Sequence, residues 1–398
     1  MSRVNVAVFF GGTSVEHEIS VITALQLFKS IDSNKYNVVP VYISQPGVWY
    51  SGEELKTREY FQTVVSADKP INLDEVALIP GQKSGNLTIL KSASRSPFRS
   101  REIKVDVCFP VIHGTGGEDG TLQGLFELAQ VPYTGCGVLA ASLAMNKWAC
   151  KRFVADAVPV LPGYLVTRDA YRANASAVEN EIFGIDQLSK FPLIVKPCSL
   201  GSSIGVGPAS DIGSLRSSLA DAFRYDEAAL VEPMITNLTE INVSVLEGNP
   251  PVATVIEVPR SKGILTYDDK YMSGAGSKKQ GGSSEGMAAL DRDIDPDFIP
   301  EATKLTVREM AVRIYSLLNC AGISRIDFMM DNEANQVYFN EINILPGSLS
   351  FYLWQASKPS LLYPELVDRL IEGAIARHGS AHLSTRNMGF QALTKSGS

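Results

Sequence analysis

A segment near the end of the chain carries side chains that bind cations and anions. In SRIDFMMDNEANQVYFNEINILPGS, Arg325 and Asp327 come first, and Glu341 and Asn343 stand just before a Pro-Gly turn. If the segment forms two strands joined by a polar turn, Glu341 and Asn343 share one face, since residues two apart in a strand point the same way. Oxygen ligands of this kind suit Mg²⁺, and an arginine beside them suits a polyphosphate. On its own, however, such a hairpin is more often a solvated sheet face.

Three lysines elsewhere in the chain could supply the positive charge that a nucleotide phosphate site needs. Lys196 ends a predicted strand and enters the Gly/Ser loop of VKPCSLGSSIGVG, whose backbone N–H groups could wrap phosphate oxygens. Lys147 begins a predicted helix, and Lys270 stands beside Tyr271, just before a Gly/Ser-rich stretch that we expect to form a lid over residues 270–290. No GxxxxGK[ST] motif occurs. Each lysine taken alone could be a surface charge.

Four further polar residues occupy positions where ligands often bind. Glu232 and Glu240 flank a turn after a predicted strand and could hold adenine and ribose, although an exposed acidic turn is the simpler interpretation. Glu16 lies at the start of a helix behind a glycine turn, where carboxylates also serve as caps. His113 follows a predicted parallel strand, at the edge where open α/β sheets bind ligands. A lone histidine is more often structural.

Composition limits the classes of protein. A chain of 398 residues with 45% hydrophobic residues predicts two or three domains. The net charge of -7 argues against a nucleic-acid or membrane-surface partner. Five scattered cysteines without a CxxC motif read as reduced thiols, and no apolar run reaches the roughly 18 residues of a membrane span. With no signal sequence at its start, the chain is expected to be cytoplasmic.

The order of predicted elements indicates an α/β protein of several units. Strands and helices alternate over 1–140, which is typical of a doubly wound parallel sheet, with 51–104 as an insertion or an elaborated edge. A helix over 138–156 leads into the second unit, 141–235. The third unit, 236–380, contains the hairpin and a final helix at about 364–377. The polar tail, 381–398, is expected to be disordered.

Several sequence runs, taken in order, resemble the D-alanine–D-alanine ligase family of the ATP-grasp superfamily. The runs that carry the resemblance are FFGGTSVEHEIS, VIHGTGGEDGTLQGLFELAQVPYTGCGVLAASLAMNK, FPLIVKPCSLGSSIGV, VEPMI with TEINVSVLEG, YDDKY, and SRIDFMM with NEINILPGS. They extend from about residue 4 to residue 350, with breaks at 51–104 and 272–300. The resemblance implies a three-domain ATP-grasp fold with ATP between the central and C-terminal sheets. It also implies a homodimer that joins two D-alanines through an acyl phosphate for peptidoglycan synthesis.

The resemblance also implies roles for individual residues. Lysines on the phosphates and glutamates on adenine and ribose would hold ATP: Lys147, Lys196, Lys270, Glu232 and Glu240. Asp327, Glu341 and Asn343 would hold two Mg²⁺ ions, or Mn²⁺ in their place. Arg325 and the backbone N–H of Gly347 would stabilise the oxyanion. Glu16, hydrogen-bonded to Ser202 and Tyr271, would hold the first ammonium, and His113 and Ser350 would lie at the substrate carboxylates.

The chain departs from the family pattern mainly at the second-substrate pocket. After the Pro-Gly turn, relatives usually carry a threonine and two serines, whereas SLSFYLWQAS keeps Ser350 and places Tyr352 where a serine is usual. Asn146 replaces an aspartate, and Pro233 and Met234 replace a lysine and an aromatic residue near adenine. Two alternatives therefore stay open: a ligase joining D-alanine to D-lactate, D-serine or another amino acid, and a non-catalytic nucleotide-binding regulator.

Overall fold

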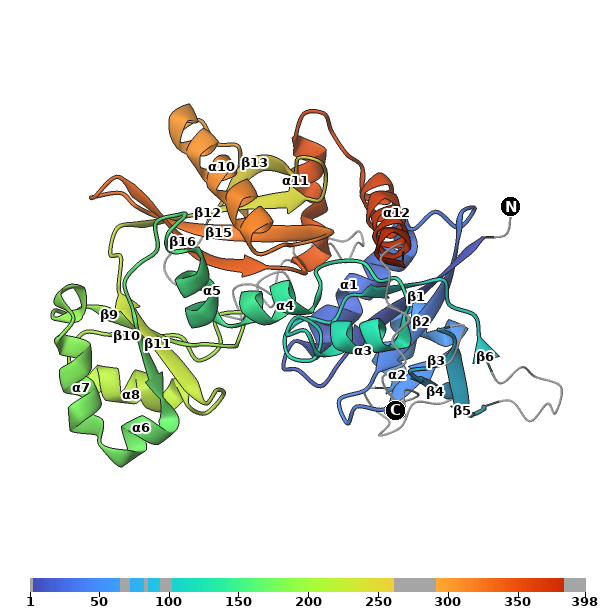
Figure 1. Ribbon diagram of the computed structural model, residues 1–398, viewed down its shortest axis with the longest axis horizontal. Coiled ribbons are helices and arrows are strands. Elements are labelled where there is room, and N and C mark those ends of the chain that lie inside the picture. Colours follow the sequence, from blue (N-terminus) through green and yellow to red (C-terminus); the bar gives the residue numbers. More distant parts are fainter. Residues whose placement is uncertain (1–2, 65–71, 82–84, 94–101, 261–290, 383–398) are drawn as a thin grey trace, which may run out of the picture.

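A computed structural model describes residues 3–64, 72–81, 85–93, 102–260 and 291–382. Three sheets of seven, four and five strands organise these residues (Figure 1). Helices α4 (Val138–Met145) and α5 (Lys147–Val154) lie between the sheets. No helix in the described ranges is long and apolar enough to cross a membrane. All five cysteines are free thiols.

The N-terminal sheet has a parallel core with an antiparallel extension. Strand β1 (Val4–Gly11) pairs in parallel with β2 (Tyr36–Ile43) and β7 (Val107–Pro110). Its side chains alternate between two cores, one under α1 (His17–Ser30) and the other against α3 (Thr121–Ala129). The predicted parallel core with helices on both faces is therefore confirmed.

Residues 51–104 extend this sheet rather than forming a separate unit. They contribute antiparallel strands to the order β6-β5-β4-β3-β2-β1-β7. The strands beyond β2 are β3 (Trp49–Ser51), β4 (Asp74–Leu78), β5 (Leu87–Lys91) and β6 (Glu102–Ile103). A 3-10 turn (Glu53–Lys56) and α2 (Arg58–Val64) connect β3 to the next part of the chain. The expected elaborated edge is thus present, built from antiparallel pairs.

The central sheet is antiparallel, in the order β10-β9-β11-β8. Its strands are β8 (Tyr164–Thr167), β9 (Leu193–Pro197), β10 (Gly207–Ala209) and β11 (Ala228–Pro233). The segments α6 (Arg168–Ala173), α7 (Ala175–Phe183) and α8 (Ile212–Ala222) accompany it in Figure 1. A core containing Val178, Ile182, Leu215 and Leu219 joins α7 and α8 to the sheet.

The single helix predicted over 138–156 was wrong, because Asn146 divides it. The backbone of Asn146 is extended (φ -94°, ψ 104°), so α4 ends before it. Its side-chain oxygen then accepts a hydrogen bond of 2.9 Å from the backbone N–H of Ala149 and caps α5. This break places Lys147 at the first position of a helix, facing the region where the sheets meet.

The C-terminal sheet has the order β14-β13-β12-β15-β16. Its strands are β12 (Leu238–Leu246), β13 (Val252–Pro259), β14 (Arg292–Ile294), β15 (Ile323–Asp331) and β16 (Gln336–Asn343). Helix α10 (Glu301–Leu317) packs on one face through Val307, Ala311 and Ile314, in a core shared with α4 and α5. The turn Gly347–Ser350 leads to α11 (Phe351–Ala356).

The last helix, α12 (Tyr363–His382), returns to the N-terminal sheet (Figure 1). Leu366 and Leu370 share a core with Val107 of β7 and Leu27 of α1. The helix extends beyond the expected end near residue 377, so the predicted disordered tail, 381–398, was wrong for residues 381 and 382. The hydroxyl of Ser380 donates a 3.0 Å hydrogen bond to the carbonyl of Ala376, within the last turns.

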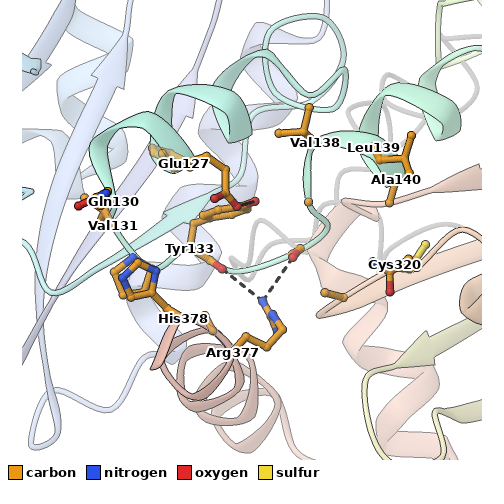
Figure 2. A pocket seen from close by; sticks show the side chains of 17 residues that line it. Glu127, Gln130, Val131, Tyr133, Val138, Leu139, Ala140, Cys320, Arg377 and His378 are labelled. Carbon is orange, nitrogen blue, oxygen red and sulfur yellow. Dashed lines mark hydrogen bonds between the residues drawn. The ribbon is translucent and has the colours of Figure 1, made fainter. Parts of the chain in front are cut away.

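Figure 2 shows how α12 ties the N-terminal and C-terminal parts together, beside a cavity of about 520 Å³. Arg377 donates hydrogen bonds to the carbonyl oxygens of Tyr133 (3.3 Å) and Gly135 (3.4 Å). The same guanidinium pairs with Glu247, whose carboxylate also accepts from the backbone N–H of Gly322 (2.6 Å). None of the predicted site residues that the structure describes lines this cavity.

Candidate active site

A small cleft lies where the three sheets meet, and all three contribute to its walls. It is lined by Glu16, Gly114, Glu118, Ala144, Met145, Lys147, Leu200, Gly201, Glu341, Ile342, Asn343 and Ile344. Four residues predicted from the sequence are therefore brought together from distant parts of the chain: Glu16, Lys147, Glu341 and Asn343.

The predicted hairpin forms, with its acidic and amide side chains on one face. In the antiparallel pair β15–β16, Asp327 lies opposite Glu341, and Arg325 lies opposite Asn343. The Nε and Nη2 atoms of Arg325 each donate a 2.7 Å hydrogen bond to Asp327, and Asn343 Nδ2 donates one of 3.0 Å. Burial, together with the negative charge of Glu341, raises the pKa of Asp327, although Arg325 opposes that shift.

The donor set at this face fits a magnesium ion. Asp327 and Glu341 offer carboxylate oxygens and Asn343 an amide oxygen, and Mg²⁺ typically takes one or two carboxylates together with phosphate oxygens and waters. Among the described residues, no three His, Cys, Asp or Glu side chains cluster closely enough to hold an ion by themselves. The remaining coordination positions would therefore belong to water and a polyphosphate.

Lys147 connects this face to the central part of the molecule. Its Nζ lies 3.0 Å from Glu341 Oε2 and donates a 2.6 Å hydrogen bond to the carbonyl of Leu200. Burial lowers the pKa of Lys147, but the nearby Glu341 outweighs this effect, and the net pKa is raised. The lysine is therefore a fixed positive charge at the edge of the cleft.

Lys196 belongs to a second, deeper cluster of charges. Its Nζ lies 2.9 Å from Glu232 Oε2 and 3.1 Å from Asn340 Oδ1. The other oxygen of Glu232 accepts from Lys151, and Glu232 is 0% exposed. Burial raises the pKa of Glu232, but the two lysines outweigh it and lower the pKa overall. Burial also lowers the pKa of Lys151 to about 8, although Glu232 opposes that shift.

Sequence reasoning missed Lys151, although one signal pointed to it. Lys151 follows Lys147 by four residues, so the two lie on one face of α5. Both oxygens of Glu232 are occupied by lysines, whereas Glu240 is partly exposed on β12. Contacts of Glu232 and Glu240 with adenine and ribose stay predictions.

The first-domain side of the cleft carries two glutamates. Glu16 lies just before the first residue of α1, is 6% exposed, and accepts a hydrogen bond from the hydroxyl of Ser202, as the resemblance implied. Glu118, which sequence reasoning missed, accepts a 2.7 Å hydrogen bond from the backbone N–H of Gly114. Burial, together with the charge of Glu16, raises the pKa of Glu118 to about 8. The signal for Glu118 was its place in the glycine-rich turn at the end of β7.

Other predicted residues lie around the cleft or outside the described ranges. His113 is buried behind the cleft wall, 3.0 Å from the hydroxyl of Thr23, and burial lowers its pKa to about 4. Its neutral ring is therefore held by α1, and a role at the substrate carboxylate stays a prediction. Lys270, Tyr271 and the predicted lid at 270–290 fall outside the described residues.

The turn after β16 has an unusual backbone. Gly347 begins it, and Ser348, Leu349 and Ser350 follow with φ angles of 51°, 52° and 47°, in the left-handed region that non-glycine residues rarely adopt. Ser350 is fully buried, and its hydroxyl has no hydrogen-bond partner within the described part of the chain. Such strain clusters at ligand sites. The roles of Gly347 and Ser350 stay predictions.

Comparison with known proteins identifies the family. Residues 5–136 match the model described as "D-ala D-ala ligase N-terminus", and residues 153–372 match "D-ala D-ala ligase C-terminus". D-alanine–D-alanine ligases from Ruminiclostridium cellulolyticum and Heliobacterium modesticaldum are 37% and 36% identical. Each match covers 95% of this chain, together with 97% and 96% of the respective relative.

Solved structures agree with the sequence matches. The D-alanine–D-alanine ligase of Coxiella burnetii has a TM-score of 0.75 at 26% identity, covering 96% of this chain and 97% of that one. The VanG D-Ala:D-Ser ligase of Enterococcus faecalis has a TM-score of 0.74 at 28% identity, covering 94% and 100%. These matches confirm the expected ATP-grasp architecture, and the chain belongs to the D-alanine–D-alanine ligase family.

Proposed function

We propose that the protein is an ATP-dependent ligase that joins two D-alanines for peptidoglycan synthesis. The observation that carries this proposal is that three polar pairs lie in or beside one cleft, in a chain of this family. The pairs are Glu16 with Ser202, Lys147 with Glu341, and Arg325 with Asp327. A carboxylate suits an amino-acid ammonium, while lysines and oxygen ligands for a metal suit the phosphates of ATP.

The reaction proceeds in two steps. A carboxylate oxygen of the first D-alanine takes the γ-phosphoryl group of ATP, giving an acyl phosphate and ADP. The amine of the second D-alanine then attacks the acyl carbon, loses a proton, and the tetrahedral intermediate expels phosphate. Glu16, held by Ser202, binds the first ammonium, and Arg325 with the Gly347 N–H stabilises the oxyanion.

The phosphoryl transfer needs positioning and charge neutralisation more than covalent help. Lys147 and Lys196 hold the phosphates. Lys270, which lies outside the described residues, is assigned to the phosphates as well. Glu232 and Glu240 are assigned to the nucleoside. Asp327, Glu341 and Asn343 would hold magnesium or manganese, which would neutralise the negative charge of the phosphates. With ATP bound, Lys147 and Lys196 would replace some of their contacts with glutamates by contacts with phosphate oxygens.

The wider proposal includes the arrangement of the protein. We assign an N-terminal domain to residues 1–140, a central subdomain to 141–235 and a C-terminal subdomain to 236–380, and we propose that the protein is a cytoplasmic homodimer.

A ligase for D-serine or another acceptor is not favoured. The relatives that are 34–37% identical over 94% or more of this chain are named D-alanine–D-alanine ligase. The D-Ala:D-Ser ligase is 28% identical.

The test is phosphate release from ATP with D-alanine as the sole amino acid, together with identification of the product by mass spectrometry. We expect phosphate and D-alanyl-D-alanine in equal amounts. Turnover only with a mixed pair of substrates would favour the rival ligase. Absence of ATP turnover with any D-amino acid would favour a nucleotide-binding regulator.

A further inference from the structure

Two cysteines from distant parts of the chain lie together beside the cavity of Figure 2. Cys136 lies in the connection between α3 and α4, and Cys320 lies in the turn between α10 and β15. Cys320 packs against the buried hydrophobic core that contains Cys136, and the two thiols are hydrogen-bonded to one another. This dithiol therefore connects the N-terminal part of the chain to the C-terminal sheet.

The two segments that carry these cysteines touch through their backbones. A Cβ atom on Gly322 would lie 2.8 Å from the Cα of Gly135, so only a residue without a side chain allows this approach. The sulfur of Cys136 lies 3.4 Å from the carbonyl oxygen of Ala321 and 3.8 Å from Ser324 Oγ. It is thus packed directly against the turn that carries the second cysteine.

One ion pair holds both segments in place. Arg377 donates to the carbonyl oxygen of Gly135, next to the first cysteine, and Glu247 accepts from the backbone N–H of Gly322, near the second. Arg377 and Glu247 also pair with one another. The two thiols therefore stay close together in the reduced protein, without any rearrangement of the chain.

The two thiols differ in their access to small molecules. Cys320 is partly exposed and lines the cavity, as Figure 2 shows, whereas Cys136 is 2% exposed and does not line it. The cavity of about 520 Å³ has room for hydrogen peroxide, which is little larger than a water molecule of about 30 Å³. An oxidant in the cavity would therefore meet Cys320 first, with Cys136 directly behind it.

The hydrogen bond between the thiols also prepares Cys136 to react. The Cys320 thiol lowers the pKa of Cys136, and Ala321 and Ser324 assist against the opposing effect of burial. The same hydrogen bond, together with burial, raises the pKa of Cys320. Because the thiolate is the attacking form of a cysteine, Cys136 is suited to attack an oxidised Cys320.

We propose that Cys136 and Cys320 form a reversible disulfide when a hydroperoxide enters the cavity. The Cys320 sulfur attacks a peroxide oxygen, the O–O bond breaks, and Cys320 becomes a sulfenic acid with loss of water. The Cys136 sulfur then attacks the Cys320 sulfur, the S–O bond breaks, and a second water leaves. In total, two thiols lose two hydrogen atoms and one hydrogen peroxide is reduced to two waters. The cavity and the candidate active site share no lining residue, so this inference goes beyond the ligase function.

The test exposes the purified full-length protein to hydrogen peroxide, then denatures it and alkylates every remaining thiol. Mass spectrometry of an unreduced digest identifies joined peptides. We expect the number of alkylated cysteines to fall from five to three and the Cys136 and Cys320 peptides to be joined, with loss of two hydrogen atoms. Dithiothreitol should restore all five thiols.

The other three cysteines serve as internal controls, because all of them are buried. Burial raises the pKa of Cys150 and of Cys198 to about 12, and it raises the pKa of Cys108 as well. These thiols stay protonated near pH 7, so they should remain free and take up the alkylating reagent.

Substitution of one cysteine separates the two steps. In Cys136→Ser, Cys320 should stop at the sulfenic acid, which dimedone traps, and then proceed to the sulfinic acid. In Cys320→Ser, Cys136 should stay reduced, because it does not line the cavity. If either serine variant does not fold, the alanine variant at the same position should give the same products.

Several results would overturn the inference while leaving the ligase function intact. They are five alkylated cysteines after peroxide treatment, a sulfinic acid on Cys320 of the wild type without a joined peptide, and a disulfide from Cys320 to Cys150 instead. Equal rates of oxidation at Cys320 and at the three control cysteines would also contradict it.

Discussion

Glu232 joins two buried lysines, so replacing it with glutamine should be costly. The carboxylate is 0% exposed and pairs with Lys196 at 2.9 Å and with Lys151 at closer range. In Glu232→Gln, the isosteric amide carries no charge, and two ammonium groups stay buried without their counter-ion. Lys196 keeps the neutral oxygen of Asn340 as a hydrogen-bond partner.

The size of the effect follows from burial. Removing one partner of a buried ion pair typically costs about 3–5 kcal/mol, because the remaining charge is uncompensated. We expect a loss of that size in the free energy of unfolding at pH 7. It should be visible as an earlier urea transition of tryptophan fluorescence, to which Trp148 contributes from α5 beside the cluster.

The loss should depend on pH with a definite sign. Burial already lowers the pKa of Lys151 to about 8 in the folded protein, against about 10.4 when unfolded. Without Glu232, the folded pKa falls further, so the unfolded state binds more protons than the folded state around pH 7 to 8. Stability of the variant therefore rises with pH across this window, and its deficit relative to wild type shrinks from pH 7 to pH 9.

Glu227→Gln is the matched control, because it removes the same charge in the same part of the chain from an exposed pair. Glu227 lies 2.8 Å from Arg168 with its side chain 79% exposed, and such surface pairs are worth about 0–1 kcal/mol. Equal losses in the two variants, or a Glu232→Gln deficit that grows toward pH 9, would refute the reasoning.

Three further predictions concern the cleft. Glu341→Gln should lower the turnover number at least 100-fold in a phosphate-release assay with little change in the melting temperature; near-normal turnover would remove Glu341 from the metal site. Ser202→Ala removes a hydrogen bond to the charged Glu16, worth about 1.5–3 kcal/mol. The KM for the first D-alanine should therefore rise about 10-fold to 150-fold in initial-rate kinetics. A rise in the KM for ATP alone would contradict the assignment. Glu118→Gln should gain stability relative to wild type as pH rises from 5 to 8. The folded pKa of Glu118, about 8, exceeds its unfolded value, so ionisation of the carboxylate destabilises the folded wild type over this range. If urea unfolding gave the two proteins parallel plots of stability against pH, that pKa would be disproved.

Local pattern was sufficient to predict the hairpin that carries the proposed metal ligands. Alternation fixes which side chains share a face, so Asp327, Glu341 and Asn343 could be grouped from the sequence alone. The link between Glu16 and Ser202 spans 186 residues, and only the family resemblance could suggest it.

Contacts between distant strands were beyond sequence reasoning. Lys151 and Glu232 are 81 residues apart, and Tyr352 and Glu257 are 95 apart, with no local signal that joins them. Asn146 illustrates a different difficulty: an asparagine between two apolar helical stretches fits either a helix interior or an N-cap, and the tertiary position of α5 decides between them. The five residues that extend α12 beyond residue 377 were likewise missed, because the polar sequence of the final turns resembles a loop.

Oxygen transfer between the substrates tests the acyl-phosphate pathway most directly. D-alanine labelled with ¹⁸O in both carboxylate oxygens is incubated with enzyme, ATP and Mg²⁺ in unlabelled water, and the released phosphate is analysed by mass spectrometry. Because the leaving phosphate retains the carboxylate oxygen that attacked ATP, we predict one ¹⁸O atom per phosphate and one dipeptide per phosphate. Unlabelled phosphate would show that water attacks ATP instead, and would contradict the proposed mechanism.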